Sequence, residues 1–164
     1  MLRFALLAVL LGGAAPALAQ PRPGDPPTAD QVVTWEALLD KRSVRRGEEV
    51  TLTLTARIAA GWKLYAMDSQ AGRPLEVRLN DDLGGFRRTA GPTQSRTFTD
   101  FDDALGMDYT YFAGQGTVTL RFRANRNARR GRHTLGGSVR FAVCSDEICL
   151  PPKQATFAAP VHVR

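Results

Sequence analysis

The sequence predicts an all-β fold, an immunoglobulin-like β-sandwich of about seven to nine mostly antiparallel strands. Short runs of alternating apolar and polar residues recur along the chain, and turn residues such as Arg46-Gly47 and Ala60-Gly61 separate them. No segment has a convincing helical period. Residues 30–39 give a helical hint, and an irregular first strand fits them equally well. A small barrel is the alternative arrangement.

Period-two alternation is clearest in residues 50–58, where Val50, Leu52 and Leu54 alternate with threonines. The longest stretch without clear alternation covers residues 91–110. In a compact domain, a loop of that length is usually functional or hides a strand. Clear alternation predicts further strands at residues 75–79, 117–123, 139–143 and 157–163.

The first 19 residues have the order of a secretory signal peptide, with a positive start, an apolar run and the small residues Ala17-Leu18-Ala19. We predict cleavage after Ala19, because the apolar run is too short to span a bilayer comfortably as a retained anchor. Residues 20–31 are rich in proline and are predicted to form a flexible leader. Residues 32–164 then form one domain.

Composition limits the classes of function. The 164 residues are 43% hydrophobic, which suits one domain with a real core and excludes general disorder. The net charge of +6 raises nucleic-acid binding as a hypothesis. Residues 125–132, the densest basic cluster, hold no aromatic side chain and are typical of a turn. A solvated basic surface, or contact with an anionic envelope, is therefore favoured over nucleic acid.

The only two cysteines, Cys144 and Cys149, exclude a disulfide-dense scaffold and a four-cysteine zinc site. Four residues separate them, which is neither a C-x-x-C motif nor half of a zinc knuckle. The spacing permits a disulfide across a tight turn. Because Phe141 and Val143 are predicted to point into the core, Cys144 should point to the outer face, accessible to a partner.

A structural disulfide is the simplest interpretation for an exported protein. However, a six-residue ring removes only about 2 kcal/mol of chain entropy, and a domain of this size should not need a staple. A short surface ring is the kind of disulfide whose potential can suit exchange. Asp146 and Glu147 within the ring should raise the pKa of the nearby thiol, which fits a pair attacked by a partner's thiolate.

Copper handling is a third hypothesis, although no spacing supports it. We predict no resident metal, flavin or nucleotide. The side chains that could bind copper are Cys144, Cys149, His133, His162, Met67 and Met107.

Three segments resemble one family. The run from Cys144 to Pro152, with Leu-Pro-Pro after the second cysteine, resembles the N-terminal periplasmic domain of the thiol:disulfide interchange protein DsbD. The segment Gly61-Trp62-Lys63-Leu64-Tyr65 is similar to that family's glycine–aromatic–x–aliphatic–tyrosine segment. Residues 102–106, followed by Tyr109 and Tyr111, resemble the acidic loop that caps the cysteines. The resemblance extends from about residue 33 to the C-terminus.

The resemblance implies an exported, periplasmic sandwich whose Cys144/Cys149 pair cycles between dithiol and disulfide, with Cys144 forming the mixed disulfides. Such a domain passes reducing equivalents between thioredoxin-fold periplasmic proteins, including disulfide isomerases and cytochrome c maturation reductases. We expect a free-standing monomer, supplied by a separate membrane thiol electron conduit. Whether the chain counts as a protein-disulfide reductase or only as an interchange component stays open.

The resemblance also implies a set of residues near the cysteines. Tyr65 and Asp103 would lie beside the pair. The family's capping aromatic aligns near Ala104, so Phe101 and Leu105 are the candidate substitutes. The alternative function, from another class, is a non-catalytic envelope interaction module whose disulfide only fixes the turn.

Overall fold

The computed structural model describes residues 26–103 and 106–164. The predictions that fall on residues 1–25, the signal peptide and most of the leader, lie outside the described residues, as does Leu105. The described chain contains one short helix, α1 (Ala29–Val32), and twelve strands. Ala29 is fully buried, so packing begins within residues 20–31, which the sequence analysis assigns to the leader.

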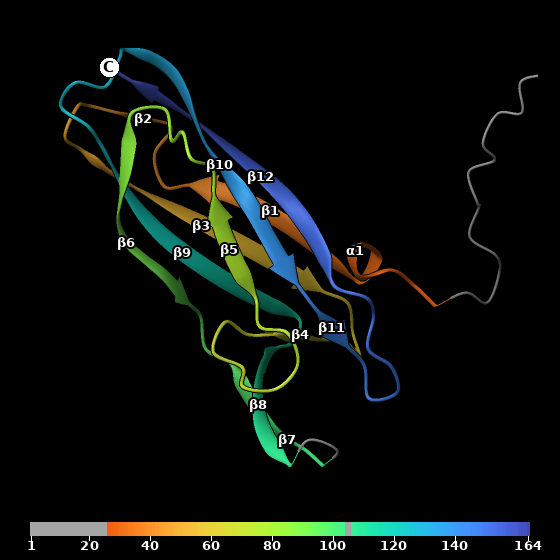
Figure 1. Cartoon of the computed structure of the whole chain (residues 1–164). Helices are drawn as coiled ribbons and strands as arrows, with labels where there is room; N and C mark the ends of the chain where they lie inside the picture. Colours follow the sequence, from red (N-terminus) through yellow and green to blue (C-terminus); the bar gives the residue numbers. More distant parts are fainter. Residues whose placement is uncertain (1–25, 104–105) are drawn as a thin grey trace, which may run out of the picture.

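In the two central strands of the first large sheet every second residue is buried, which gives the sheet one apolar face. Its neighbouring strands pair antiparallel, so Val50 on one strand faces Phe122 on the next. Figure 1 shows the two central strands, β3 (Glu49–Ile58) and β9 (Gln115–Ala124), lying side by side. In spatial order the strands are β1 (Val33–Leu39), β3 (Glu49–Ile58), β9 (Gln115–Ala124) and β6 (Phe86–Gln94).

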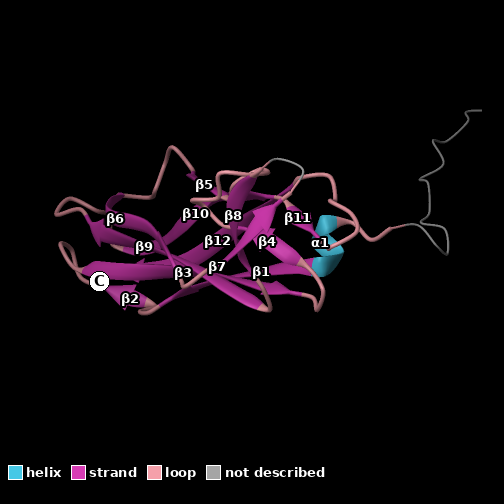
Figure 2. Cartoon of the chain, turned by 90° about the horizontal axis from the view of Figure 1, so that it is seen from below, coloured by secondary structure: helices cyan, strands magenta, loops and turns pink. Residues whose placement is uncertain are grey.

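The second large sheet packs against the first. Its pairs are antiparallel except for the parallel contact between its first two strands. In the view from below, α1 lies at one extremity and the C-terminus near the other (Figure 2). In spatial order the strands are β2 (Ser43–Val44), β12 (Lys153–Val163), β10 (Gly131–Phe141) and β5 (Glu76–Leu79).

One continuous apolar core lies between these two sheets. It combines side chains such as Leu52 and Leu120 of the first sheet with Leu135 and Phe141 of the second, each at most 1% exposed. Within the described residues no ladder of hydrogen bonds joins the two sheets, so they form a sandwich and not the alternative small barrel.

A third, small sheet lies at one end of the sandwich, where β7 (Phe98–Asp102) and β8 (Met107–Phe112) project away from the large sheets (Figure 1). It carries both the first cysteine and the tyrosine of the glycine–aromatic motif. In spatial order its strands are β11 (Val143–Cys144), β4 (Lys63–Tyr65), β8 (Met107–Phe112) and β7 (Phe98–Asp102).

The all-β character and the mostly antiparallel pairing are confirmed, whereas the predicted number of strands is too low. Strands β2, β4 and β11 have two or three residues each, too few for alternation to be detected. Residues 91–110 hide β7 and most of β8, in which buried and exposed side chains do not alternate regularly. The turn predicted at residues 125–132 does separate β9 from β10, although β10 already begins at Gly131.

Candidate functional site

A disulfide joins Cys144, the last residue of β11, to Cys149, and the two Cα atoms are 4.0 Å apart. Ser145 holds the intervening turn. Its backbone N–H donates to the carbonyl oxygen of Ile148 at 2.8 Å, and its hydroxyl oxygen accepts from the N–H groups of Glu147 and Ile148. Serine is common in such turns because its side chain can bond local backbone groups. The prediction that this spacing permits a disulfide is confirmed.

The two cysteines differ in exposure. Cys149 is exposed, whereas Cys144 is 7% exposed. Cys144 lies outside the main core, as the alternation predicts, but it packs in a second small cluster with Tyr65, Ala142 and Tyr109. The prediction that Cys144 is accessible to a partner is therefore wrong. Alternation fixes the face to which a side chain points, but on that face Tyr65 and Tyr109, from neighbouring strands of the same small sheet, pack over Cys144.

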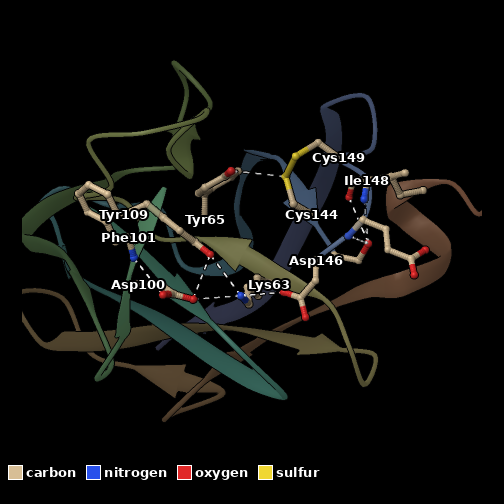
Figure 3. A network of polar contacts seen from close by, with 11 residues as sticks. Lys63, Tyr65, Asp100, Phe101, Tyr109, Cys144, Asp146, Ile148 and Cys149 are labelled. Atoms are coloured by element: carbon tan, nitrogen blue, oxygen red, sulfur yellow. Dashed lines mark hydrogen bonds and ion pairs between the residues drawn. A yellow bond between two sulfur atoms is a disulfide. The ribbon is translucent and has the colours of Figure 1, made fainter. Parts of the chain in front are cut away.

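Tyr65 contacts the disulfide directly. Its hydroxyl oxygen lies 3.4 Å from Cys144 Sγ (Figure 3), and because a disulfide sulfur carries no hydrogen, the hydroxyl is the donor. Burial raises the pKa of Tyr65, which keeps this proton in place. Its ring packs edge-to-face against Tyr109, with centroids 5.7 Å apart. Gly72 makes room for the ring, since a Cβ there would lie 2.5 Å from it.

Lys63 connects three parts of the site. Its Nζ lies 2.9 Å from Asp146 Oδ1 in the disulfide turn and 3.2 Å from Asp100 Oδ2 in β7, and it donates to the Tyr109 hydroxyl oxygen at 3.2 Å. The hydrogen bond to Asp146, followed by the one to Tyr109, raises the pKa of Lys63. The same ammonium is the main reason that the pKa of Asp100 is lowered. These contacts tie β4, β7 and the disulfide turn together (Figure 3).

An open pocket of about 370 Å³ lies beside the disulfide and is lined by both cysteines. Its walls are acidic and aromatic. Of the described residues that line it, only Lys63 is basic. The aromatic lining comes from Tyr65, Phe101 and Tyr109, and the acidic lining comes from Asp100, Asp102, Asp103 and Asp146.

The structure brings three of the four predicted neighbours of the cysteines to this pocket. Tyr65 contacts the disulfide, and Phe101 and Asp103 line the pocket. Phe101 is 53% exposed, so it flanks the disulfide without burying it. Leu105 lies outside the described residues. The roles of these residues stay predictions.

Sequence reasoning missed the importance of Lys63 and Asp100. Lys63 occupies the variable position of the glycine–aromatic motif, which gives no reason to single it out. Its proximity to the cysteines depends on β4 pairing with β11, a contact between segments far apart in the chain. Asp100 joins the site because β7 pairs with β8, and neither strand has a clear alternation in sequence.

The copper candidates do not form a recognisable metal site in the part of the chain that the structure describes. No three His, Cys, Asp or Glu side chains converge there into a group that could hold a metal ion. His133 instead contacts Phe86, with ring centroids 6.0 Å apart, and its Nε2 lies 2.6 Å from the carbonyl oxygen of Arg129.

Comparison with known protein families shows which family the chain belongs to. The family described as thiol:disulfide interchange protein DsbD, N-terminal, matches residues 29–160. The chain belongs to the DsbD N-terminal domain family. This agrees with the resemblance seen in the cysteine, glycine–aromatic and acidic segments, and the match begins at the residue where α1 begins. No curated protein matches the chain.

Solved structures similar to this DsbD N-terminal family member include the N-terminal periplasmic domain of ScsB from Proteus mirabilis, at 14% identity and a TM-score of 0.46, covering 79% of this chain and 45% of that one. BcpA, the major pilin subunit of Bacillus cereus, is similar at 7% identity and a TM-score of 0.42, covering 80% of this chain and 39% of that one. The chain thus spans less than half the length of either. Within residues 26–103 and 106–164, no helix could cross a membrane.

Proposed function

We propose that the chain is a thiol:disulfide exchange domain that passes reducing equivalents between thioredoxin-fold partners through Cys144 and Cys149. One observation carries the proposal. In a member of the DsbD N-terminal family, the cysteine pair forms a disulfide with one exposed end, beside an open pocket. Export to the periplasm by the predicted signal peptide, and action there as a monomer, are part of the proposal.

Reduction follows ordinary thiol–disulfide chemistry. A partner thiolate attacks Cys149 Sγ, a new sulfur–sulfur bond forms, and the electron pair of the old bond goes to Cys144 Sγ as a thiolate. The partner's second thiol then loses its proton and attacks the sulfur of the partner's first cysteine, which is bonded to Cys149 Sγ in the mixed disulfide. This forms the partner's disulfide and releases Cys149 as a thiolate. Two protons then return to the two thiolates. The partner loses two electrons and this chain gains two.

Exposure favours Cys149 as the attacked sulfur, instead of Cys144, to which the family resemblance assigns the mixed disulfides. An attacking thiolate must approach along the line of the sulfur–sulfur bond, and Cys144 is packed under Tyr65 and Tyr109. Cys149 is exposed, and so is the side chain of Ile148, the residue before it in the disulfide turn, at 44%. In the reverse reaction, the exposed Cys149 thiolate is again the group that reaches a partner.

The surface around the disulfide suits a protein partner. Phe101 and Ile148, both large apolar side chains, are 53% and 44% exposed and come from the β7 strand and the disulfide turn. Exposed apolar groups beside a reactive centre contribute to docking of another protein surface.

A redox titration tests the proposed function. The protein is equilibrated with glutathione or dithiothreitol buffers of known potential, and free thiols are trapped and counted by mass spectrometry. A pair that serves exchange should be half-reduced above about −300 mV. A pair that stays oxidised well below this potential is structural, which supports the envelope interaction module.

The Cys144→Ala/Cys149→Ala double variant is the matched control. It should fold and lose all exchange with a reduced thioredoxin-fold protein. If the double variant keeps its function in cells, the exchange proposal fails.

A further inference from the structure

We propose that Lys63 is a positioning residue for disulfide exchange, whose ammonium group stabilises the negative charge that forms on Cys144 Sγ when the disulfide opens. This inference rests on the proposed function for its biological meaning. The electrostatic effect itself can be measured without a protein partner.

The first observation is the strand register. In the antiparallel pair of β11 and β4, Cys144 lies directly opposite Lys63. Directly opposed residues of antiparallel strands have Cβ atoms about 4.5–5.5 Å apart and project to the same face of the sheet. Both side chains line the same pocket beside the disulfide. Figure 3 shows Lys63 and Cys144 on neighbouring strands, with Asp146 beside the lysine.

The second observation is the environment of Cys144. With the cysteine 7% exposed, a thiolate formed there has little contact with water and needs protein groups to stabilise it. The Tyr65 hydroxyl, 3.4 Å from the sulfur, supplies one hydrogen bond. Among the described residues lining the pocket, Lys63 supplies the only positive charge.

The third observation is the charge that Lys63 balances. Asp146 and Asp100 lie 2.9 and 3.2 Å from its Nζ, and Asp102 and Asp103 line the same pocket. Without the ammonium group, the carboxylates of Asp100 and Asp146 would lose the positive charge that they share with Cys144. Nearby negative charge disfavours a thiolate and makes it a poorer leaving group. The lysine therefore permits an acidic partner-binding surface to surround a reducible disulfide.

The test compares Lys63→Met with Lys63→Arg, which keeps the charge. Lys41→Met is the matched control, because Lys41 also pairs with a carboxylate, that of Glu48 at 3.0 Å, but lies outside the pocket lining. In the reduced protein carrying Cys149→Ser, thiolate absorbance against pH gives the pKa of Cys144. We expect Lys63→Met to raise this pKa by about one unit, and Lys63→Arg and Lys41→Met to leave it close to the parent value.

A second readout uses the intact disulfide. Reduction by dithiothreitol at pH 7 should be about threefold slower in Lys63→Met, because a leaving thiolate of higher pKa departs more slowly. An unchanged or lowered pKa of Cys144, or faster reduction, would overturn the proposal. Faster reduction would mean that Lys63 acts only through its ion pair with Asp100, by keeping β7 close to the disulfide and so restricting access to it. Circular dichroism checks that each variant folds.

Asp146→Asn keeps the proposal testable should Lys63→Met fail to fold. Removing this carboxylate should shift the pKa of Cys144 downward, the direction opposite to the lysine variant. An unchanged pKa in this variant contradicts the electrostatic account. Because these measurements use a small dithiol, they can succeed while exchange with thioredoxin-fold proteins fails, which separates this inference from the proposed function.

Discussion

The sandwich core and the disulfide end are built in different ways. The core joins long, alternating strands through fully buried side chains such as Leu52, Leu120 and Phe122. Among the described residues, the buried cluster at the disulfide end contains Tyr65, Ala142 and Cys144, with Tyr109 packed against it. It is held by hydrogen bonds, ion pairs and aromatic contacts, and its strands β4 and β11 have three and two residues.

This difference separates stability from reactivity. Apolar burial over a large core provides most of the free energy of folding. The disulfide end contributes little burial, so its geometry can serve the chemistry of sulfur, and its polar contacts can set the charge around Cys144. Substitutions in the two regions should therefore differ both in size and in what they change.

The largest effect is expected from the core. Phe122→Ala removes a fully buried ring and should lower the free energy of unfolding by roughly 3–5 kcal/mol, measured by urea denaturation. The disulfide of the folded variant should keep the wild-type reduction potential. Leu38→Ala is the control, because Leu38 is 57% exposed and its loss should change stability by less than about 0.5 kcal/mol. A shifted potential in Phe122→Ala would show that the two regions are coupled.

A smaller effect is expected where the disulfide end depends on close packing. Gly72 has a φ of +73°, and a Cβ at this position would overlap the Tyr65 ring. Gly72→Ala should cost about 2 kcal/mol of unfolding free energy, from backbone strain and the displaced ring. It should also speed alkylation of the reduced Cys144, because the ring covers it.

Gly114→Ala is the matched control for this prediction. Gly114 has a similar φ of +68°, but no atom lies within 4 Å of its added Cβ. It should show only the backbone cost, about 1 kcal/mol, without faster alkylation of Cys144. Equal alkylation rates in the two variants would contradict the role given to Gly72.

The sequence predicts the core better than the disulfide end. Alternation is visible in residues 50–58 and 117–123 because a half-buried strand needs one apolar face. The spacing of the two cysteines also permits the disulfide that the structure contains. The cover over Cys144 does not, because it comes from short strands that carry no repeating pattern. Lys63 could not be recognised for a related reason. Its place opposite Cys144 depends on the pairing of β4 with β11, two short strands that are far apart in the sequence.

The smallest expected effect concerns pH. Lys63 lowers the pKa of Asp100 in the folded protein below the unfolded value of about 3.9. The stabilisation from this pair is therefore present above that unfolded value and is lost as the pH falls through the folded pKa. Asp100→Asn should lower the urea midpoint slightly at pH 6, and the difference from wild type should vanish near pH 2. In a Lys63→Met background, the difference at pH 6 should largely disappear; if it persists in full, the ion pair is not its source.

The identity of the attacked sulfur tests the central claim most directly. The oxidised protein is mixed with a thioredoxin-fold protein that keeps only its attacking cysteine, and the trapped adduct is digested and sequenced by mass spectrometry. The exposure of the two cysteines predicts a mixed disulfide through Cys149, with Cys144 recovered as a free thiol. An adduct through Cys144, or a disulfide that stays intact without any adduct, would contradict the account.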